Sequence, residues 1–343
     1  MRAICLSLLT LCIGLPVQGA DWYPTPVVSD GSLLGYQPLP KASQPWRLCA
    51  LLPQGKDRYW WGVSWGLAEE ARRQGVQLGI YEAGGYQYAD VQLAQLNRCM
   101  QRGADALLIA GINTSDLCPQ IEALHQTGVP VIDLVNRLEC AGISAHSRVS
   151  FTEMAKVAVA YIRDHSNGRA VRVGWLPGPQ NAGWVVDADK GVQQAVAGTT
   201  VTLVTGGYGP PDRASQAKLV RELLLREPNL DYVLGNGEAA AFAAQLKRNT
   251  GGRYHFQVVS FYATEQLLAL ISKGEVLAAP SDAPVIQARM AIDLAVRALE
   301  KQALPKLVSP QIRMLDAPTL RHFDRQLLMP PDGQWMVLQE MPE

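Results

Sequence analysis

Short apolar runs that suit β-strands alternate with amphipathic helical patterns along most of this chain of 343 residues. Strands that alternate with helices form parallel sheets, and their crossovers are right-handed. The alternation runs through residues 46–134 and restarts near residue 171, so we expect two Rossmann-like α/β lobes with parallel sheets. Strands are predicted at 47–52, 76–81, 106–109, 129–134, 171–176, 201–205, 232–235 and 257–261, and helices at 59–74, 91–101, 120–127, 185–197, 213–227, 239–248 and 265–273.

A long helical pattern at residues 285–300 follows the strands of the second lobe and precedes a last strand-like run at 307–314. We place this helix on the first lobe, which makes the chain cross between the lobes through hinge segments. Two lobes joined by hinges commonly close around a small ligand in the cleft between them. Crossings are predicted near 144–150, 279–283 and 304–309, the first lobe comprises 46–146 plus 284–304, and the second comprises 147–280 plus 307–343.

The first twenty residues contain one arginine, then an apolar run, then small residues. This order is typical of a secretory signal peptide, which we assign to residues 1–20. The apolar run is shorter than the roughly 20 residues that span a bilayer, and no later stretch is long enough. We therefore expect an exported protein without direct membrane insertion. Residues 21–45 are rich in Pro and Ser without helical period, and predict an irregular N-terminal segment.

Four cysteines remain after the signal peptide: Cys49, Cys99, Cys118 and Cys140. An even number of cysteines in an exported protein indicates disulfides, and four cysteines allow three pairings. Cys49 lies on the first predicted strand and Cys99 faces inward on a helix packed on the same sheet, whereas Cys118 and Cys140 follow neighbouring strands. We favour Cys49–Cys99 and Cys118–Cys140. The alternative for the first pair is two buried thiols.

Composition and motifs exclude several classes of function. Acidic and basic residues balance at 31 each, so nothing indicates a nucleic acid or a membrane surface as partner. The cysteines have no zinc-site spacing, and no Gly-rich phosphate loop follows the first strand. The five histidines do not accompany a recognisable nucleophile motif. We expect no cofactor, no metal and no enzymatic activity.

A carboxylate and three aromatic rings follow the first predicted strand, in the run Lys56-Asp57-Arg58-Tyr59-Trp60-Trp61. The carboxyl ends of strands in α/β sheets open onto the ligand crevice. Aromatic faces beside a carboxylate suit a methylated, positively charged group, whereas a phosphate would need Gly-rich backbone and a cation. The alternatives are that Asp57 only caps a helix and that the rings only pack against neighbours.

Several segments in a consistent order resemble the TorT-type periplasmic sensors of trimethylamine N-oxide. The matching segments are 46–51, 56–60, 82–86, 176–183, 258–262 and 278–282. These sensors share the two-lobed fold of type I periplasmic binding proteins and work with the membrane histidine kinase TorS. The resemblance implies a periplasmic protein of a two-component system for anaerobic respiration. It implies trimethylamine N-oxide, or a close methylammonium compound, as ligand and the periplasmic domain of a TorS-like kinase as partner.

The resemblance also implies a set of ligand-binding residues. Phe151 stands where the family pattern has Trp, which removes an N–H donor, and Trp184 stands where the family has a smaller residue. Asn181 is either a ligand residue or a turn residue. Asp282, beside a predicted hinge, is either a hinge group or a ligand contact. The cage implied by the resemblance consists of Asp57, Tyr59, Trp60, Tyr86 and Tyr262.

Two other binding functions stay open. A solute-binding protein that delivers its ligand to an ABC transporter would have the same lobes and would differ only in what its outer surface contacts. A sugar-binding relative is disfavoured, because the strand ends lack matched Asp, Asn and Arg groups for several hydroxyls.

Overall fold

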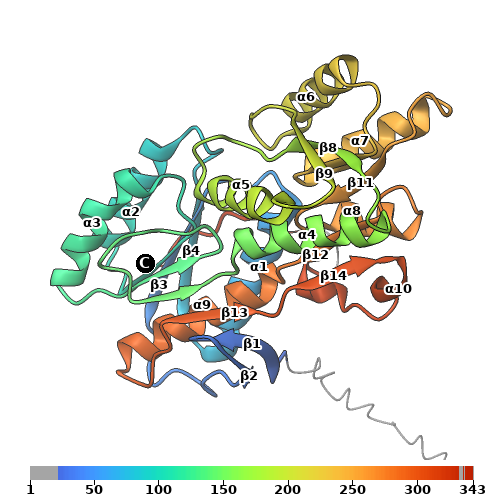
Figure 1. Cartoon of the computed structure of the whole chain (residues 1–343). Helices are drawn as coiled ribbons and strands as arrows, with labels where there is room; N and C mark the ends of the chain where they lie inside the picture. The colour runs from blue at the N-terminus through green and yellow to red at the C-terminus, as the bar shows by residue number, and fades with distance from the viewer. Residues whose placement is uncertain (1–21, 332–334, 336, 343) are drawn as a thin grey trace, which may run out of the picture.

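The computed structural model describes residues 22–331, 335 and 337–342, which form two α/β lobes (Figure 1). The predicted signal peptide, residues 1–20, lies outside the described residues. In the first lobe the sheet order is β2-β1-β13-β7-β6-β5-β3-β4, and all pairings except those of β1 are parallel. Its strands are β1 (Thr25–Ser29), β2 (Ser32–Tyr36), β3 (Arg47–Leu52), β4 (Gln77–Glu82), β5 (Ala106–Ile109), β6 (Val131–Leu134), β7 (Ala145–Ser147) and β13 (Leu307–Pro310).

The second sheet has the order β14-β12-β11-β10-β8-β9 and is parallel except at its edge strand β14. Two mostly parallel sheets with covering helices confirm the predicted α/β class. The central strands are buried on both faces, which is why they occur in the sequence as continuous apolar runs. Its strands are β8 (Val171–Leu176), β9 (Val201–Thr205), β10 (Tyr232–Gly235), β11 (Gln257–Ser260), β12 (Ala278–Ser281) and β14 (Arg313–Asp316).

Helices cover both faces of each sheet. On the first sheet, α1 (Arg58–Gln74) and α9 (Pro284–Leu299) pack together on one face, and α2 (Ala89–Gln101) and α3 (Thr114–Gln126) cover the other. Helices α1 and α9 approach closely at Gly66, where a Cβ atom would lie 2.5 Å from the carbonyl oxygen of Val285. On the second sheet, α4 (Phe151–His165) and α5 (Gly183–Val196) oppose α6 (Arg213–Arg226), α7 (Gly237–Asn249) and α8 (Glu265–Ser272).

Helix α4 is absent from the helices that the sequence predicted. It begins directly after the first crossing, where Ser150 is its N-cap and accepts a hydrogen bond from the N–H of Glu153 at 3.2 Å. A Ser followed three residues later by Glu is a recognised helix-start signal, so the sequence did contain the information. This helix matters for the site, because its first residue is Phe151.

The N-terminal segment was predicted to be irregular over 21–45, and this was wrong for β1 and β2. These strands form a hairpin whose first strand pairs with β13, with Val27 opposite Pro310. At the end of the hairpin, the hydroxyl of Tyr36 in β2 donates to the buried carboxylate of Asp293 on α9 at 2.6 Å. The partners lie more than 250 residues away, so local sequence patterns carry no signal for this pairing.

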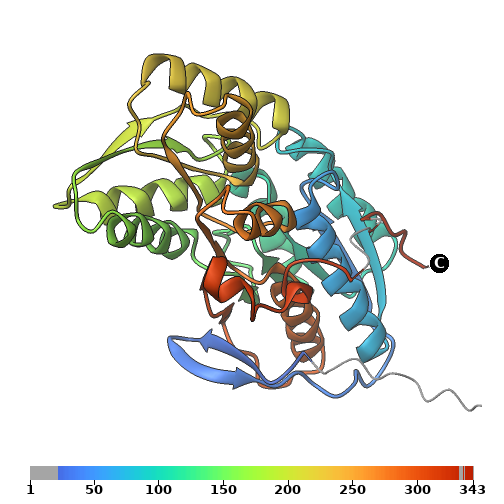
Figure 2. The ribbon, with the colours of Figure 1, turned by 90° about the vertical axis from the view of Figure 1, so that its right-hand side faces the viewer.

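The assignment of 307–343 to the second lobe was wrong for two parts of that range. Strand β13 pairs with β7 in the first sheet, so the third crossing lies after β13, between Pro310 and Arg313, and not at 304–309. After α10 (Ala317–Leu320) and the 3-10 helix η1 (Arg325–Leu327), the chain returns to the first lobe, where Gln339 bridges Ile80 of β4. Figure 2 shows this last stretch along the outer edge of the first lobe.

Both favoured disulfides are present. Cys49 of β3 is bonded to Cys99 of α2, and Cys118 of α3 is bonded to Cys140 in the loop that follows β6. Cys118 was expected in a loop, but α3 begins at Thr114, earlier than the predicted start at residue 120. The first bond lies in the core of the first lobe and the second lies near its surface.

Candidate ligand-binding site

A small cavity lies between the two lobes, at the carboxyl ends of β3, β4 and β6. Its volume is about 30 Å³. The first lobe contributes Gln54, Asp57, Tyr59, Trp60, Tyr86, Val135 and Asn136 to its lining, and the second contributes Phe151, Trp184, Pro211 and Tyr262. Seven of the nine predicted ligand-binding residues therefore line one cavity, and Asn181 and Asp282 do not.

Asp57 both caps helix α1 and lines the cavity. Its Oδ1 accepts the backbone N–H of Tyr59 at 2.8 Å, which is the capping bond expected for Asp at this position. Burial raises the pKa of the Asp57 carboxyl above its ordinary value of 3.8, and the capping bond only partly opposes this effect. The two interpretations of Asp57, cap and site residue, are thus compatible. A positive charge in the cavity would stabilise the ionised carboxylate.

Tyr59 is held from behind by Asp282. The Tyr59 hydroxyl donates to Oδ2 of Asp282 at 2.6 Å, and the Gln287 side chain donates to the same oxygen at 2.9 Å. Asp282 is fully buried, and this burial raises its carboxyl pKa, although the two hydrogen bonds lower it. Burial also raises the pKa of Tyr59 well above its usual range. Asp282 therefore lies in the hinge between β12 and α9 and fixes a cavity wall without lining the cavity.

Tyr86 reaches the cavity from the loop between β4 and α2. Gly84 and Gly85 precede it with φ values of +93° and +151°, a conformation that residues with a Cβ rarely adopt. The N–H of Gly85 donates to the carbonyl of Pro53 at 2.8 Å, which ties this loop to the end of β3. At the other end, the Tyr86 hydroxyl accepts a hydrogen bond from the side-chain amide of Asn136 at 3.2 Å.

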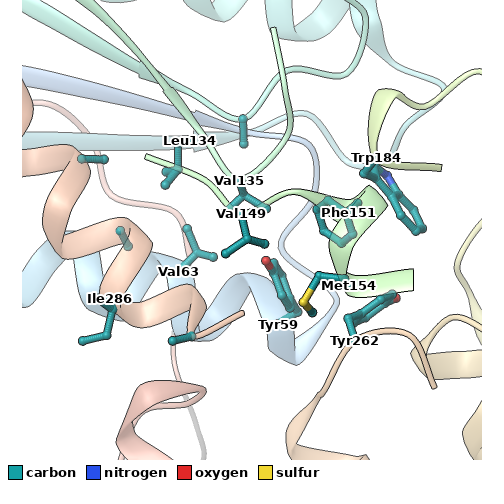
Figure 3. Packing of buried hydrophobic residues seen from close by; sticks show 14 of the residues in the cluster. Tyr59, Val63, Leu134, Val135, Val149, Phe151, Met154, Trp184, Tyr262 and Ile286 are labelled. Carbon is teal, nitrogen blue, oxygen red and sulfur yellow. The ribbon is translucent and has the colours of Figure 1, made fainter. Parts of the chain in front are cut away.

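Aromatic rings from the second lobe close the cavity. Trp184 is 5% exposed, and its ring centroid lies 5.9 Å from Phe151, 6.0 Å from Tyr262 and 6.1 Å from Tyr86. Figure 3 shows Phe151 and Trp184 side by side, with Tyr59 and Tyr262 near them. Between ring centroids, Tyr59 lies 5.4 Å from Trp60 in its own lobe and 6.0 Å from Tyr262 across the cleft. Such distances are typical of aromatic contacts, so the rings form one continuous lining.

Asn181 does not join this lining. Its side chain is exposed and faces a separate groove that Tyr86 also borders. Conversely, the sequence analysis did not identify Asn136, which is buried and follows Val135 at a φ of +61°. Its position directly after β6 was a usable signal, because ligand residues gather at the carboxyl ends of parallel strands. Gln54, Val135 and Pro211 were also missed, and their lining positions follow only from the folded chain.

This arrangement suits recognition of a small, methylated, positively charged group. Aromatic faces attract cations and cover methyl groups, and Asp57 supplies one carboxylate. Among the described residues, no group of three or more His, Cys, Asp or Glu side chains could hold a metal ion. A membrane-spanning helix was likewise not found in the described ranges.

Comparison with known proteins agrees with this geometry. A family model described as "Periplasmic binding protein domain" matches residues 49–303. The Periplasmic protein TorT of Escherichia coli (strain K12) is 35% identical over 332 residues, which cover 95% of this chain and 93% of that protein. A relative at this identity over almost the whole chain indicates common descent of both lobes.

Two solved structures have the same architecture. An ABC transporter solute-binding protein from Bradyrhizobium sp. BTAi1 with bound Bis-Tris is 38% identical, with a TM-score of 0.82 over 94% of this chain and 100% of that chain. TorT in the TorS sensor domain–TorT complex in the presence of TMAO is 25% identical, with a TM-score of 0.77 over 86% of this chain and 100% of that chain. The chain therefore belongs to the periplasmic binding protein family, in the group of relatives that includes TorT, and is a protein of the periplasm, as the sequence predicted.

Proposed function

We propose that this protein binds trimethylamine N-oxide, or a close methylammonium compound, in the cavity between its lobes. The observation that carries the proposal is the small cavity lined by Tyr59, Trp60 and Tyr86 from one lobe and by aromatic rings from the other. Each cation–π contact with a methylated nitrogen contributes roughly 0.5–2 kcal/mol, depending on how completely the site excludes water. A ligand of a few heavy atoms fits this volume better than a sugar does.

The ligand class also agrees with the relatives. A solved TorT structure was obtained in the presence of TMAO, and this chain matches that structure over 86% of its length. The cavity has one carboxylate, Asp57, which would face the positively charged nitrogen. We infer that the protein releases its ligand unchanged, because periplasmic binding proteins are a non-enzymatic class and the cavity residues form no nucleophile–base pair.

We further propose that a TorS-like membrane histidine kinase of a two-component system senses the state of the lobes through its periplasmic domain. TorT forms a complex with the TorS sensor domain both with and without ligand, and the chain is similar to TorT in both structures. A ligand can change such a complex only through its different affinity for the different lobe arrangements. If the ligand changes the affinity for the kinase domain by some factor, binding of the kinase domain must change the ligand affinity by the same factor.

A second candidate function is delivery of a small ligand to an ABC transporter. The observation that favours it is the 38% identity to the Bradyrhizobium solute-binding protein, which contains Bis-Tris. Bis-Tris is a hydroxylated tertiary amine, so this relative also holds an amine-type compound. The lobes and the cavity would serve either function, and the two candidates differ in the partner protein.

Isothermal titration calorimetry tests the ligand. The panel comprises trimethylamine N-oxide, trimethylamine, glycine betaine, choline, Bis-Tris and ribose, each titrated into the purified mature protein. We expect the N-oxide or another methylated amine to bind most tightly and to be recovered unchanged. A clear preference for ribose or for an anion would contradict the proposal.

The partner is tested with the periplasmic domain of the histidine kinase encoded nearest to this protein. We expect a complex by analytical ultracentrifugation, and a changed ligand affinity when the kinase domain is present. A complex with unchanged ligand affinity would leave only a scaffold role. Binding to an ABC permease instead of a kinase domain would favour the transport candidate.

A further inference from the structure

The hydroxyl and indole groups at the cavity differ in whether their hydrogens are already used. The Tyr59 hydroxyl donates its hydrogen to Asp282 at 2.6 Å, so it has no hydrogen left for a ligand. Tyr86 is different, because its hydroxyl accepts from Asn136 and donates to no described residue. The direction of the Asn136–Tyr86 hydrogen bond therefore decides what Tyr86 can offer to a ligand.

Asn136 fixes that direction. Its side-chain Nδ2 lies 3.1 Å from the carbonyl oxygen of Gly111 and 3.2 Å from the Tyr86 hydroxyl. A carbonyl oxygen can only accept a hydrogen bond, so the group that faces Gly111 must be the NH₂ of the amide. The same NH₂ faces Tyr86, which makes the hydroxyl oxygen an acceptor from Asn136. The Tyr86 hydrogen is left to point elsewhere.

Trp184, in the opposite lobe, lines the cavity beside Tyr86. Its indole N–H can only donate, is buried, and has no acceptor at hydrogen-bonding distance among the described residues. The rings of Trp184 and Tyr86 lie 6.1 Å apart between centroids. Burial raises the pKa of the Tyr86 hydroxyl, and the hydrogen bond from Asn136 opposes this rise. Because the Trp184 N–H cannot accept a hydrogen bond, the Tyr86 hydrogen is left for a ligand in the cavity that Tyr86 lines.

We propose that Asn136 fixes the Tyr86 hydroxyl as a hydrogen-bond donor into the cavity, and that this donor selects ligands with an acceptor atom next to a methylated nitrogen. The inference deepens the proposed function and rests on it. An N-oxide satisfies both requirements, because its oxygen accepts and its methyl groups contact the rings. A quaternary ammonium ion of the same shape places a methyl group against the Tyr86 hydrogen and leaves this hydrogen unpaired.

Two probes of almost equal shape separate these cases. Trimethylamine N-oxide and tetramethylammonium differ by the replacement of the oxide with a methyl group. Tyr86→Phe should weaken N-oxide binding roughly 10–100-fold, the loss expected for one buried hydrogen bond, and should leave tetramethylammonium binding unchanged or tighter. The readout is the dissociation constant of tetramethylammonium divided by that of the N-oxide, both measured by calorimetry.

Two other tyrosines serve as matched controls. Tyr59→Phe removes a hydroxyl that donates to Asp282, so the ratio should not change. Tyr262→Phe removes another hydroxyl of the cavity lining, beside Gly237, and tests whether that hydroxyl is the donor instead. A lower ratio in Tyr262→Phe but not in Tyr86→Phe would assign the donor to Tyr262 and overturn the proposal. An equal loss of both probes in Tyr86→Phe would show a packing role and would also overturn it.

The positioning role of Asn136 is tested by the same ratio. Asn136→Ala removes the amide that donates to Tyr86. This variant should lower the preference for the N-oxide several-fold, less than Tyr86→Phe does, while thermal unfolding monitors folding. An unchanged ratio in Asn136→Ala would overturn the positioning role. If the wild-type protein binds neither probe, the proposed function fails, whereas binding of the N-oxide with an unchanged ratio in Tyr86→Phe removes only the inference.

Discussion

The two walls of the cavity are built differently. In the first-lobe wall the polar atoms are held by hydrogen bonds: Asp57 caps α1, Tyr59 donates to Asp282, and Tyr86 accepts from Asn136. The second-lobe wall consists mainly of rings that are held by packing: Phe151 lies against Trp184, and Trp184 stacks on Phe261. The hydrogen bond of Tyr59 also reaches the hinge that precedes α9, and the rings of the second wall make no such connection.

This difference assigns separate tasks to the two lobes. Hydrogen bonds are directional, so a wall held by them can present a carboxylate and a hydroxyl in fixed orientations before the ligand arrives. Rings held by packing supply area and exclude water, and these contributions depend less on orientation. We therefore expect the first lobe to orient the ligand and the second to cover it when the lobes close.

The largest effect should come from a ring of the first wall. Trp60→Ala removes the most effective type of ring for a cation and should weaken binding by about 1–3 kcal/mol. Phe151→Ala, on the second wall, should weaken binding by less, because Phe is smaller and a weaker partner for cations. Calorimetry with the N-oxide measures both losses. Equal losses would remove the proposed division between the walls.

Trp61 is the matched control for Trp60. Its ring does not line the cavity, and its indole N–H donates to the carbonyl of Gly55 at 2.8 Å, below the guanidinium of Arg58. Trp61→Ala therefore removes the same side chain from the neighbouring position without removing a ring from the lining. A loss equal to that of Trp60→Ala would indicate packing damage instead of a specific contact.

The second effect concerns the charge of the first wall. Asp57→Asn keeps a good N-cap and removes the carboxylate, so tetramethylammonium binding should weaken by about 1–2 kcal/mol. The N-oxide, which is neutral overall, should lose less. The opposite pattern is expected for Tyr86→Phe, which should weaken binding of the N-oxide alone. If both variants affected both ligands equally, the charge and the donor would not act separately.

Because the Asp57 carboxyl can be protonated, we also expect the affinity for tetramethylammonium to depend on pH. Burial raises its pKa above 3.8 in the free protein, and a bound cation favours the ionised form. Tetramethylammonium affinity should therefore be constant at neutral pH and fall as the pH decreases through the raised pKa, because protonation then competes with binding. The ligand itself does not titrate. Calorimetry between pH 7 and about pH 4.5 should show this fall in the wild type and not in Asp57→Asn.

The smallest effect should come from ion pairs that join the lobes beside the cavity. Arg137 of the first lobe pairs with Asp187 of α5 at 2.9 Å, and Arg58 of α1 pairs with Glu265 of α8. These pairs are partly exposed, so Arg137→Ala should weaken ligand binding by about 0.2–1 kcal/mol, and less at high salt. Arg163→Ala breaks an exposed pair within α4 and is the control. Equal effects from both variants would show that the interlobe pair does not favour closure.

Local patterns were sufficient for much of the fold. The apolar runs identified the central strands, and Asp57 before an amphipathic stretch marked the start of α1. The site residues came mainly from the family resemblance, which named Tyr86 and Tyr262 although they lie far apart in sequence. Asn136 was missed, because its importance depends on the side chains that surround it in the folded protein.

The sequence by itself determined the α/β class, which depends on periodicity, and it predicted the periplasmic location that the relatives support. It also favoured the cysteine pairs now seen, because strand and helix positions limit which sulfurs can meet. Only the tertiary structure decided that β1 pairs with β13 and that Asp282 holds Tyr59 instead of lining the cavity. The same holds for the hydrogen bond that Asn136 donates to the Tyr86 hydroxyl. Each of these depends on contacts between distant residues, whose hydrogen-bond directions are fixed only when both partners are in place.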